Sequence, residues 1–159
     1  MPHKINGIVT SFKYQGDLPN VILVGNFHFI AFDLKVSRQY NEEVISPYDQ
    51  LTKYIKKQIR ELSFKGKCAY IETDYFGGSG TQMGEVWEEG KRVLGPLITD
   101  DTILKQELSI EAKLVEHAIN ECLNLLGVYK HEGKDEFDSL RLSDLSSYEE
   151  FLNEFKTSR

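Results

Sequence analysis

Cysteine is scarce in this chain of 159 residues, which contains only Cys68 and Cys122. The two residues lie far apart, one in a predicted strand and one on the apolar face of a predicted helix. This placement argues against a disulfide framework of the kind that stabilises small secreted domains. We therefore expect two buried free thiols that pack as small apolar side chains, which suits a reducing cytoplasm.

A long uninterrupted apolar segment is also missing. The longest apolar run, over residues 21–34, is broken by residues such as His28 and Asp33 and is too short to cross a bilayer as a helix. The first residues, which include His3 and Lys4, lack the apolar stretch of a secretory signal. The sequence thus predicts a soluble, cytoplasmic protein with no membrane partner.

Motifs for metal binding and catalysis are absent too. None of the four histidines stands at metal-ligand spacing from another, so we predict neither a metal nor another cofactor. Neither cysteine lies in a small-residue turn that would present a nucleophile. The absence of a complete catalytic motif favours a protein that is not an enzyme.

Bases are fewer than acids: 19 Lys and Arg stand against 25 Asp and Glu, which gives a net charge of −6. This balance argues against a nucleic-acid partner and favours a basic one. The charge is uneven, since residues 51–67 contain six bases and one acid, and residues 132–154 contain eight acids and two bases. The two segments either neutralise each other across the folded surface or form solvated faces.

The length and the 40% apolar content predict a single domain over residues 1–159. Alternating apolar residues predict a strand over 5–14, and a second strand over 21–34 should pair with it as an antiparallel hairpin. Gly25-Asn26 is the expected site of a bulge or sharp twist in the second strand. Ser46-Pro47 predicts the start of a helix whose apolar stripe ends near Leu62.

Further along the chain, strands are predicted over 68–76, 81–88 and 91–94, with a tight turn at Glu89-Gly90 and a strand end at Gly95-Pro96. A short helix is expected over 100–106, and a longer one begins near Ser109 and ends at Gly127. A short strand is expected around 137–142, and a last helix begins near Ser147.

The order ββα-βββ-α, followed by a short C-terminal helix, is typical of an α+β fold. We expect a mostly antiparallel β-sheet of about five strands with the two main helices packed on one face. Alternating βα units, which would indicate a doubly wound parallel sheet, are absent.

The hairpin over residues 70–87 is the first place to look for a functional site. Side chains alternate along a strand, so Tyr70, Glu72 and Asp74 should share one face. Carboxylates at this spacing, roughly 6–7 Å apart, suit a cation or a basic side chain, although a solvated face or structural pairing is the favoured explanation. The glycines of residues 77–80 indicate a flexible turn, because the lysine of a phosphate loop does not follow them.

The stretch Tyr-Ile-Glu-Thr-Asp-Tyr-Phe-Gly-Gly-x-Gly-x-Gln over residues 70–82, together with Val86-Trp87 and Gly95-Pro96, resembles the small acidic immunity proteins that bacteria encode beside polymorphic or contact-dependent toxins. The resemblance implies a cytosolic protein that binds a cognate toxin domain, often a basic nuclease, and blocks its active site or substrate groove. It assigns no role to individual residues.

Two functional hypotheses follow. The first is a non-enzymatic immunity protein whose partner-binding residues are Tyr70, Glu72, Asp74, Tyr75, Gln82, Glu85 and Trp87, with the acidic C-terminal region as a further contact. The alternative is a small hydrolase or ligand-binding domain with a site around Glu72, Asp74, His28 and the Gly77–Gly80 loop. A homodimer held through a sheet edge is compatible with either hypothesis.

Overall fold

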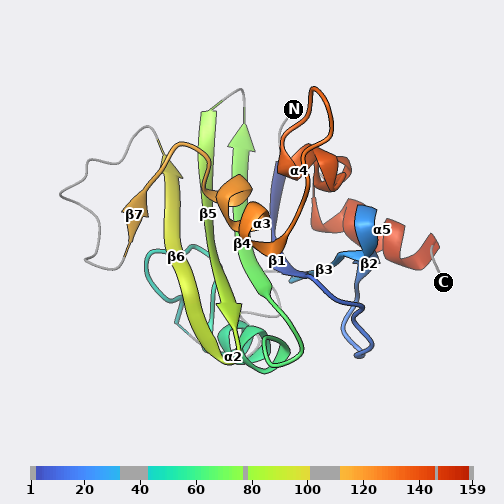
Figure 1. Cartoon of the computed structure of the whole chain (residues 1–159), viewed down its shortest axis with the longest axis horizontal. Helices are drawn as coiled ribbons and strands as arrows, with labels where there is room; N and C mark the ends of the chain where they lie inside the picture. Colours follow the sequence, from blue (N-terminus) through green and yellow to red (C-terminus); the bar gives the residue numbers. More distant parts are fainter. Residues whose placement is uncertain (1–2, 33–42, 77–78, 101–111, 146, 158–159) are drawn as a thin grey trace.

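The computed structural model describes residues 3–32, 43–76, 79–100, 112–145 and 147–157. Seven strands in this part of the chain form one sheet in the order β2-β3-β1-β4-β5-β6-β7 (Figure 1). They are β1 (His3–Thr10), β2 (Val21–Ile22), β3 (His28–Ala31), β4 (Cys68–Phe76), β5 (Ser79–Glu88), β6 (Lys91–Asp100) and β7 (Lys113–Leu114). The helices are α2 (Lys53–Leu62), α3 (Ala118–Leu126), α4 (Glu136–Ser139) and α5 (Tyr148–Thr157).

The predicted α+β class with a mostly antiparallel sheet is confirmed, because β7 on β6 makes the one parallel pair among these strands. The expected number of about five strands is wrong. The short edge strands β2 and β7 were not predicted as separate elements, since two residues are too few to show a period.

The predicted strand over residues 21–34 is divided where the sequence indicated. The short 3₁₀ turn η1 (Val24–Asn26), with Gly25 and Asn26 at positive φ, turns the chain so that β2 and β3 pair with each other. β3 in turn pairs antiparallel with β1, as the predicted hairpin requires. It lies second from the edge of the sheet, next to β2.

The hairpin of β5 and β6 turns at Glu89-Gly90 as predicted, but β6 does not end at Gly95-Pro96. The pairing between β5 and β6 shifts register near Val86, which marks a bulge. Gly95 supplies the positive φ of +97° that the bulge needs. Pro96 has no amide hydrogen, and the irregular hydrogen bonding between β5 and β6 at the bulge tolerates its absence. The strand therefore continues to Asp100.

Helix α2 begins six residues later than the sequence predicted. Its N-cap is Thr52, whose side chain accepts a hydrogen bond from the Ile55 amide, and not Ser46. Residues 45–51 instead form a loop that places Tyr48 and Leu51 in the interior. Ile55, Ile59 and Leu62 form the buried face of the helix, as the spacing of three and four predicted.

In the C-terminal third, α3 ends at Gly127 with a φ of +99°, as predicted. Its predicted start near Ser109 is wrong: the helix begins at Ala118, because Lys113 and Leu114 pair with β6 as the strand β7. The strand predicted around 137–142 is wrong: Asp135 caps the short helix α4, and η3 (Leu142–Asp144) follows. The final helix is confirmed, with Phe151 buried and Leu152 and Phe155 packed against the same core. The predicted helix over 100–106 lies outside the described residues except for Asp100, the last residue of β6.

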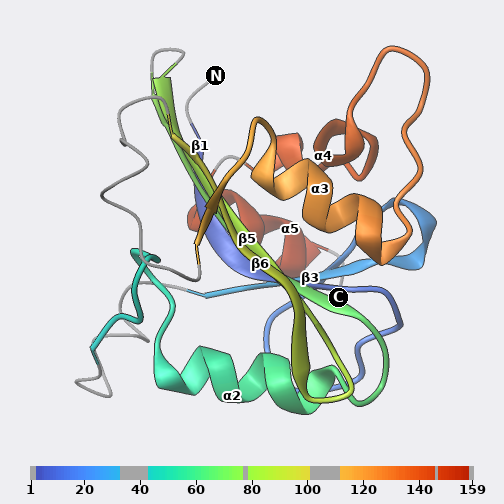
Figure 2. The same ribbon diagram turned by 60° about the vertical axis from the view of Figure 1, so that its left-hand side comes forward.

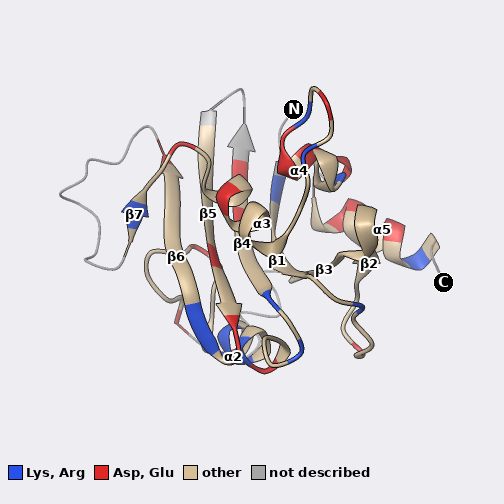
Figure 3. Ribbon diagram, in the orientation of Figure 1, with Lys and Arg blue, Asp and Glu red and all other residues tan. Residues whose placement is uncertain are grey.

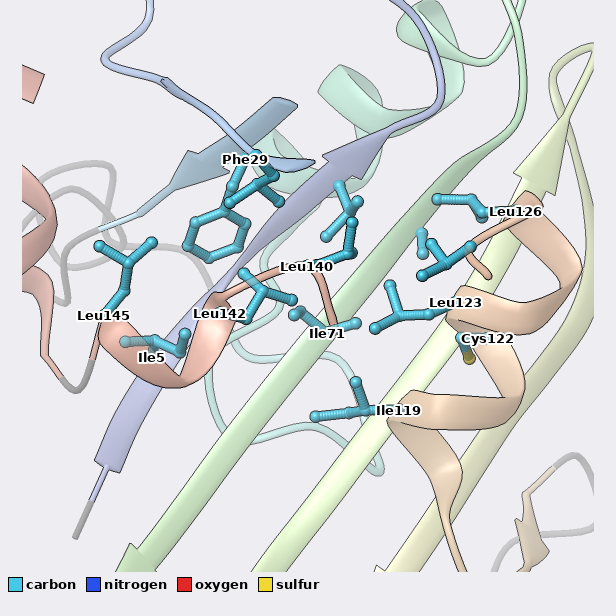
Figure 4. Packing of buried hydrophobic residues seen from close by; sticks show 14 of the residues in the cluster. Ile5, Phe29, Ile71, Ile119, Cys122, Leu123, Leu126, Leu140, Leu142 and Leu145 are labelled. Atoms are coloured by element: carbon cyan, nitrogen blue, oxygen red, sulfur yellow. The ribbon is translucent and has the colours of Figure 1, made fainter. Parts of the chain in front are cut away.

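The helices cover both faces of the sheet, which corrects the expectation that the main helices lie on one face (Figure 2). α2 packs on one face through a core that includes Ile8, Tyr70 and Ile98. α3, α4 and α5 cover the other face through a core that includes Ile71 and Phe29 (Figure 4). Both faces need cover because the central strands carry apolar side chains on both sides.

Cys68 and Cys122 are buried free thiols, one in each core, as predicted. Burial raises the pKa of the Cys68 thiol to about 12. Among the described residues, no helix combines the length and the apolar character needed to cross a bilayer.

Candidate functional site

Two glutamates of the predicted site lie in the interior. Glu72 of β4 is 5% exposed and Glu85 of β5 is 1% exposed. Tyr70 and Glu72 project toward the α2 face, while Ile71 between them projects into the opposite core. Tyr70 pairs with Glu85 across the two strands, so both carboxylates lie on the α2 side of the sheet.

The Glu72 carboxylate anchors the loop that precedes α2. Its Oε1 atom accepts hydrogen bonds from the Tyr70 hydroxyl and from the backbone N–H of Gln50, each at 2.7 Å. Its Oε2 atom accepts one from the Asp49 amide at 2.9 Å. These three donors use most of the hydrogen-bonding capacity of the carboxylate, because a carboxylate offers about four lone-pair positions.

The Glu85 carboxylate is held in the same way. The Tyr48 hydroxyl donates to Oε1 at 2.7 Å, and the Trp87 indole N–H donates to Oε2. An Arg92 guanidinium nitrogen lies 3.7 Å from Oε1. Two buried donors and one partly buried cation thus offset the cost of placing this charge in the interior.

Tyr48 and Tyr70 join the two glutamates into one cluster. Their rings meet edge to face, with centroids 5.2 Å apart. We call these five residues, Tyr48, Tyr70, Glu72, Glu85 and Trp87, the buried glutamate network. Every buried side-chain nitrogen and oxygen of the described residues has a hydrogen-bond partner, so the network is internally satisfied.

The environment shifts the acidity of the network. Burial raises the pKa of Glu72 above its usual value of 4.5, although its three hydrogen-bond donors favour the ionised form. Burial also raises the pKa of Tyr48 and Tyr70, and the neighbouring carboxylates add to the effect. Both phenols therefore stay protonated and act as hydrogen-bond donors at neutral pH.

Asp74 is the predicted residue that lies on the surface. Its side chain is 52% exposed and forms an ion pair of 3.8 Å with Lys4. Both residues line a pocket of about 340 Å³ at the end of β1 and β4, to which Glu72, Asp49 and Tyr148 also contribute. An exposed pair of this kind contributes at most about 1 kcal/mol to stability.

The remaining predicted residues have separate positions. Gln82 accepts a hydrogen bond from the Ile119 amide at 3.3 Å and so helps to fix the first turn of α3 on the sheet. Trp87 is 7% exposed, with Lys56 above its ring. Tyr75 pairs with His3 and Gly80 in the sheet, and its side chain is not among those described.

His28 does not join the glutamates. It pairs with Thr10 of β1, whereas Glu72 pairs with Asn6, so the two positions are four residues apart along β1, or about 13 Å. The His28 Nδ1 atom lies 3.3 Å from the Asn20 amide oxygen, and burial lowers the pKa of this imidazole. Of the Gly77–Gly80 loop, Gly77 and Gly78 lie outside the described residues, while Ser79 and Gly80 belong to β5.

The carboxylates of Glu72 and Glu85 are held by hydrogen bonds from within the protein. The acceptor oxygens of Glu72 and Glu85 are already engaged by buried donors, and a general base would need such an oxygen to face a substrate. Within the described ranges, no group of three or more His, Cys, Asp or Glu side chains could hold a metal. The geometry is that of a structural network.

Comparisons with protein-family models, with curated proteins and with solved structures found no match for this chain.

Sequence reasoning missed Tyr48, which links the loop to the sheet. Its partner Glu85 lies 37 residues away, so no local pattern indicates the contact. One signal was present: β4 is apolar on both faces, and a glutamate in such a strand must be buried and hydrogen bonded.

Replacing Tyr48 by Phe should lower the free energy of unfolding by about 1–3 kcal/mol, because buried Glu85 loses a donor while the ring still fits. Urea denaturation would measure the change. Tyr129→Phe is the matched control: Tyr129 is 87% exposed, and the expected change is within about 0.5 kcal/mol. Equal effects of the two substitutions would contradict the structural role of Tyr48.

The raised pKa of Glu72 has a consequence for stability. The folded chain binds this proton more tightly than the unfolded chain, so the stabilising contribution is complete below about pH 4.5 and is lost as the pH rises through the folded-state pKa. The unfolding free energy of the wild type minus that of Glu72→Gln should therefore decrease as the pH rises above about 4.5 through the folded-state pKa. A difference that increases with pH would contradict the assignment.

Proposed function

We propose that this chain is a non-enzymatic protein-binding protein, an immunity protein that neutralises a cognate bacterial toxin through an exposed acidic surface. The supporting observation is the segregation of charge on the two faces of the sheet. Residues 116–157 contain ten acids and four bases, and every acid except Glu136 is exposed. We call these exposed acids the C-terminal acidic face: Glu116, Glu121, Glu132, Asp135, Asp138, Asp144, Glu149, Glu150 and Glu154.

The acidic face surrounds α3, α4 and α5, whereas the basic residues of α2 lie across the sheet (Figure 3). This separation supports the proposal over direct neutralisation of one segment by the other. A surface with an excess of acids speeds association with a basic partner and disfavours acidic ones. It suits a basic toxin domain.

The interior supports the same proposal over the enzyme alternative. Glu72 and Glu85 are engaged in the buried glutamate network, and the positions of His28 and Glu72 are offset by about 13 Å along β1, which lies between their strands. Among the members of the predicted contact set whose side chains are described, Asp74 remains as the exposed one. The proposed contact surface therefore consists of the C-terminal acidic face. Asp74, which lines the same pocket as Tyr148 at the start of α5, is a further candidate.

Co-expression with the product of each neighbouring gene would test the proposal. We expect one such product to be toxic alone, to lose its toxicity in the presence of this chain, and to co-purify with it in stoichiometric amounts. Protection without a stable complex, or no protection by the folded chain against any neighbouring product, would contradict the proposed function.

A further inference from the structure

Helix α2 carries a row of bases on its solvent side. Lys53, Lys56, Lys57 and Arg60 follow the spacing i, i+3, i+4 and i+7, which places them along one side of the helix. We call them the α2 basic stripe. An amphipathic helix needs polar residues opposite its buried side, but that need does not explain why all four have the same sign.

The stripe borders a hollow of about 350 Å³ between α2 and the turn of β5 and β6. Its lining consists of the four bases, Trp87 and Gly90, and includes no carboxylate. The Lys56 ammonium lies 5.9 Å from the centroid of the Trp87 ring. Three acids lie close by in sequence, Glu61 of α2 and Glu88 and Glu89 before Gly90, and none of them lines the hollow. The Glu89 backbone N–H donates to the Ser63 carbonyl at the C-terminal end of α2.

An exposed aromatic ring lies at the same end of the hollow. The Phe64 side chain is 65% exposed and packs against Gly90, since a Cβ atom added to Gly90 would lie 2.5 Å from the ring. In single-stranded nucleic acid complexes, the nucleobases stack on exposed aromatic rings, while Lys and Arg side chains contact the phosphates. A peptide of acidic residues alone would use the cations and leave the ring without a partner.

The net charge of −6 does not decide what this surface binds. The stripe and the C-terminal acidic face are separated by the sheet and by a helix layer on each side, and packed layers are about 10 Å apart. The Debye length is about 8 Å at physiological ionic strength, so an anion at α2 is largely screened from the acidic face. The local sign of the charge is positive.

We propose that the α2 basic stripe binds the phosphate backbone of a single nucleic acid strand, with Phe64 as a stacking platform. This binding is independent of base sequence, because the surface offers no group aimed at the edge of a base. The inference goes beyond the proposed toxin binding, which uses the opposite face, so either function can fail without the other.

Fluorescence anisotropy with a labelled single-stranded oligonucleotide of about 12 nucleotides tests the proposal. We expect binding at low salt, with a slope of about −3 for the logarithm of the association constant against the logarithm of the salt concentration, as four phosphate contacts require. Lys53→Glu with Lys57→Glu should weaken binding at least tenfold, and Phe64→Ala should weaken it several-fold.

The matched control is Lys130→Glu with Lys134→Glu, which changes the net charge by the same amount. Both lysines are exposed and lie in the loop that follows α3. The control should leave oligonucleotide binding within about twofold of wild type, and circular dichroism would verify that each variant is folded. Three results would overturn the proposal: no binding by the wild-type chain at low salt, equal losses in the two double variants, or equally tight binding of a labelled poly-glutamate peptide of the same charge.

Discussion

Replacing Phe151 by Ala should lower the free energy of unfolding by about 3–5 kcal/mol, as truncation of a buried Phe does when the core cannot close around the space. Phe151 is fully buried, meets Phe29 edge to face at 5.7 Å and stacks on Tyr148 at 5.7 Å. It is the fully buried residue of α5, so its loss should loosen the helix and disturb the part of the acidic face that α5 carries. Urea denaturation measures the cost.

Phe64→Ala is the control for this substitution. It removes the same atoms from a side chain that is 65% exposed, and the expected change is within about 0.5 kcal/mol. A cost for Phe151→Ala below about 1 kcal/mol would show that α5 is not docked on the sheet as described.

Replacing Glu85 by Ala should also cost about 3–5 kcal/mol. The substitution removes the acceptor from two buried donors, the Tyr48 hydroxyl and the Trp87 indole N–H, and takes the anionic partner from Arg92. Thermal and urea unfolding monitored by tryptophan fluorescence would report the loss, because Trp87 is the sole tryptophan of the chain.

Glu88→Ala provides the comparison within the same strand. Glu88 lies three residues further along β5 and is partly exposed, so its replacement should change the unfolding free energy by about 0.5 kcal/mol or less. If Glu85→Ala were as mild as Glu88→Ala, the carboxylate of Glu85 would not be needed for folding, and a role in binding or catalysis would have to be reconsidered.

The parts of the fold that sequence reasoning predicted well depend on local patterns. β4 has the predicted bounds because its residues are β-formers between turn signals, and α3 ends at Gly127 because a left-handed residue closes the helix. The errors arise where distant contacts override local signals. Ser46-Pro47 has the features of a helix start, but Tyr48 packs on the α2 side of the sheet, where its hydroxyl donates to Glu85, and the helix begins after its N-cap Thr52 instead.

The candidate site shows the same limit. Alternation correctly placed Tyr70 and Glu72 on one face of β4, but it does not show what covers that face. The loop of residues 45–51 covers it, and Asp49 and Gln50 hydrogen bond to Glu72 from positions more than twenty residues away. A pair of carboxylates that suggested an exposed site is therefore divided into buried Glu72 and exposed Asp74.

The central claim is that this protein acts through exposed charge and not through its buried carboxylates. Calorimetric titration with the partner identified by co-expression tests the claim most directly, using Glu121→Lys with Glu149→Lys on the acidic face. The control, Glu43→Lys with Glu61→Lys, changes the net charge equally at exposed positions elsewhere. We predict an affinity at least tenfold weaker for the first variant and within about twofold of wild type for the control, whereas equal affinities for the two variants would contradict the claim.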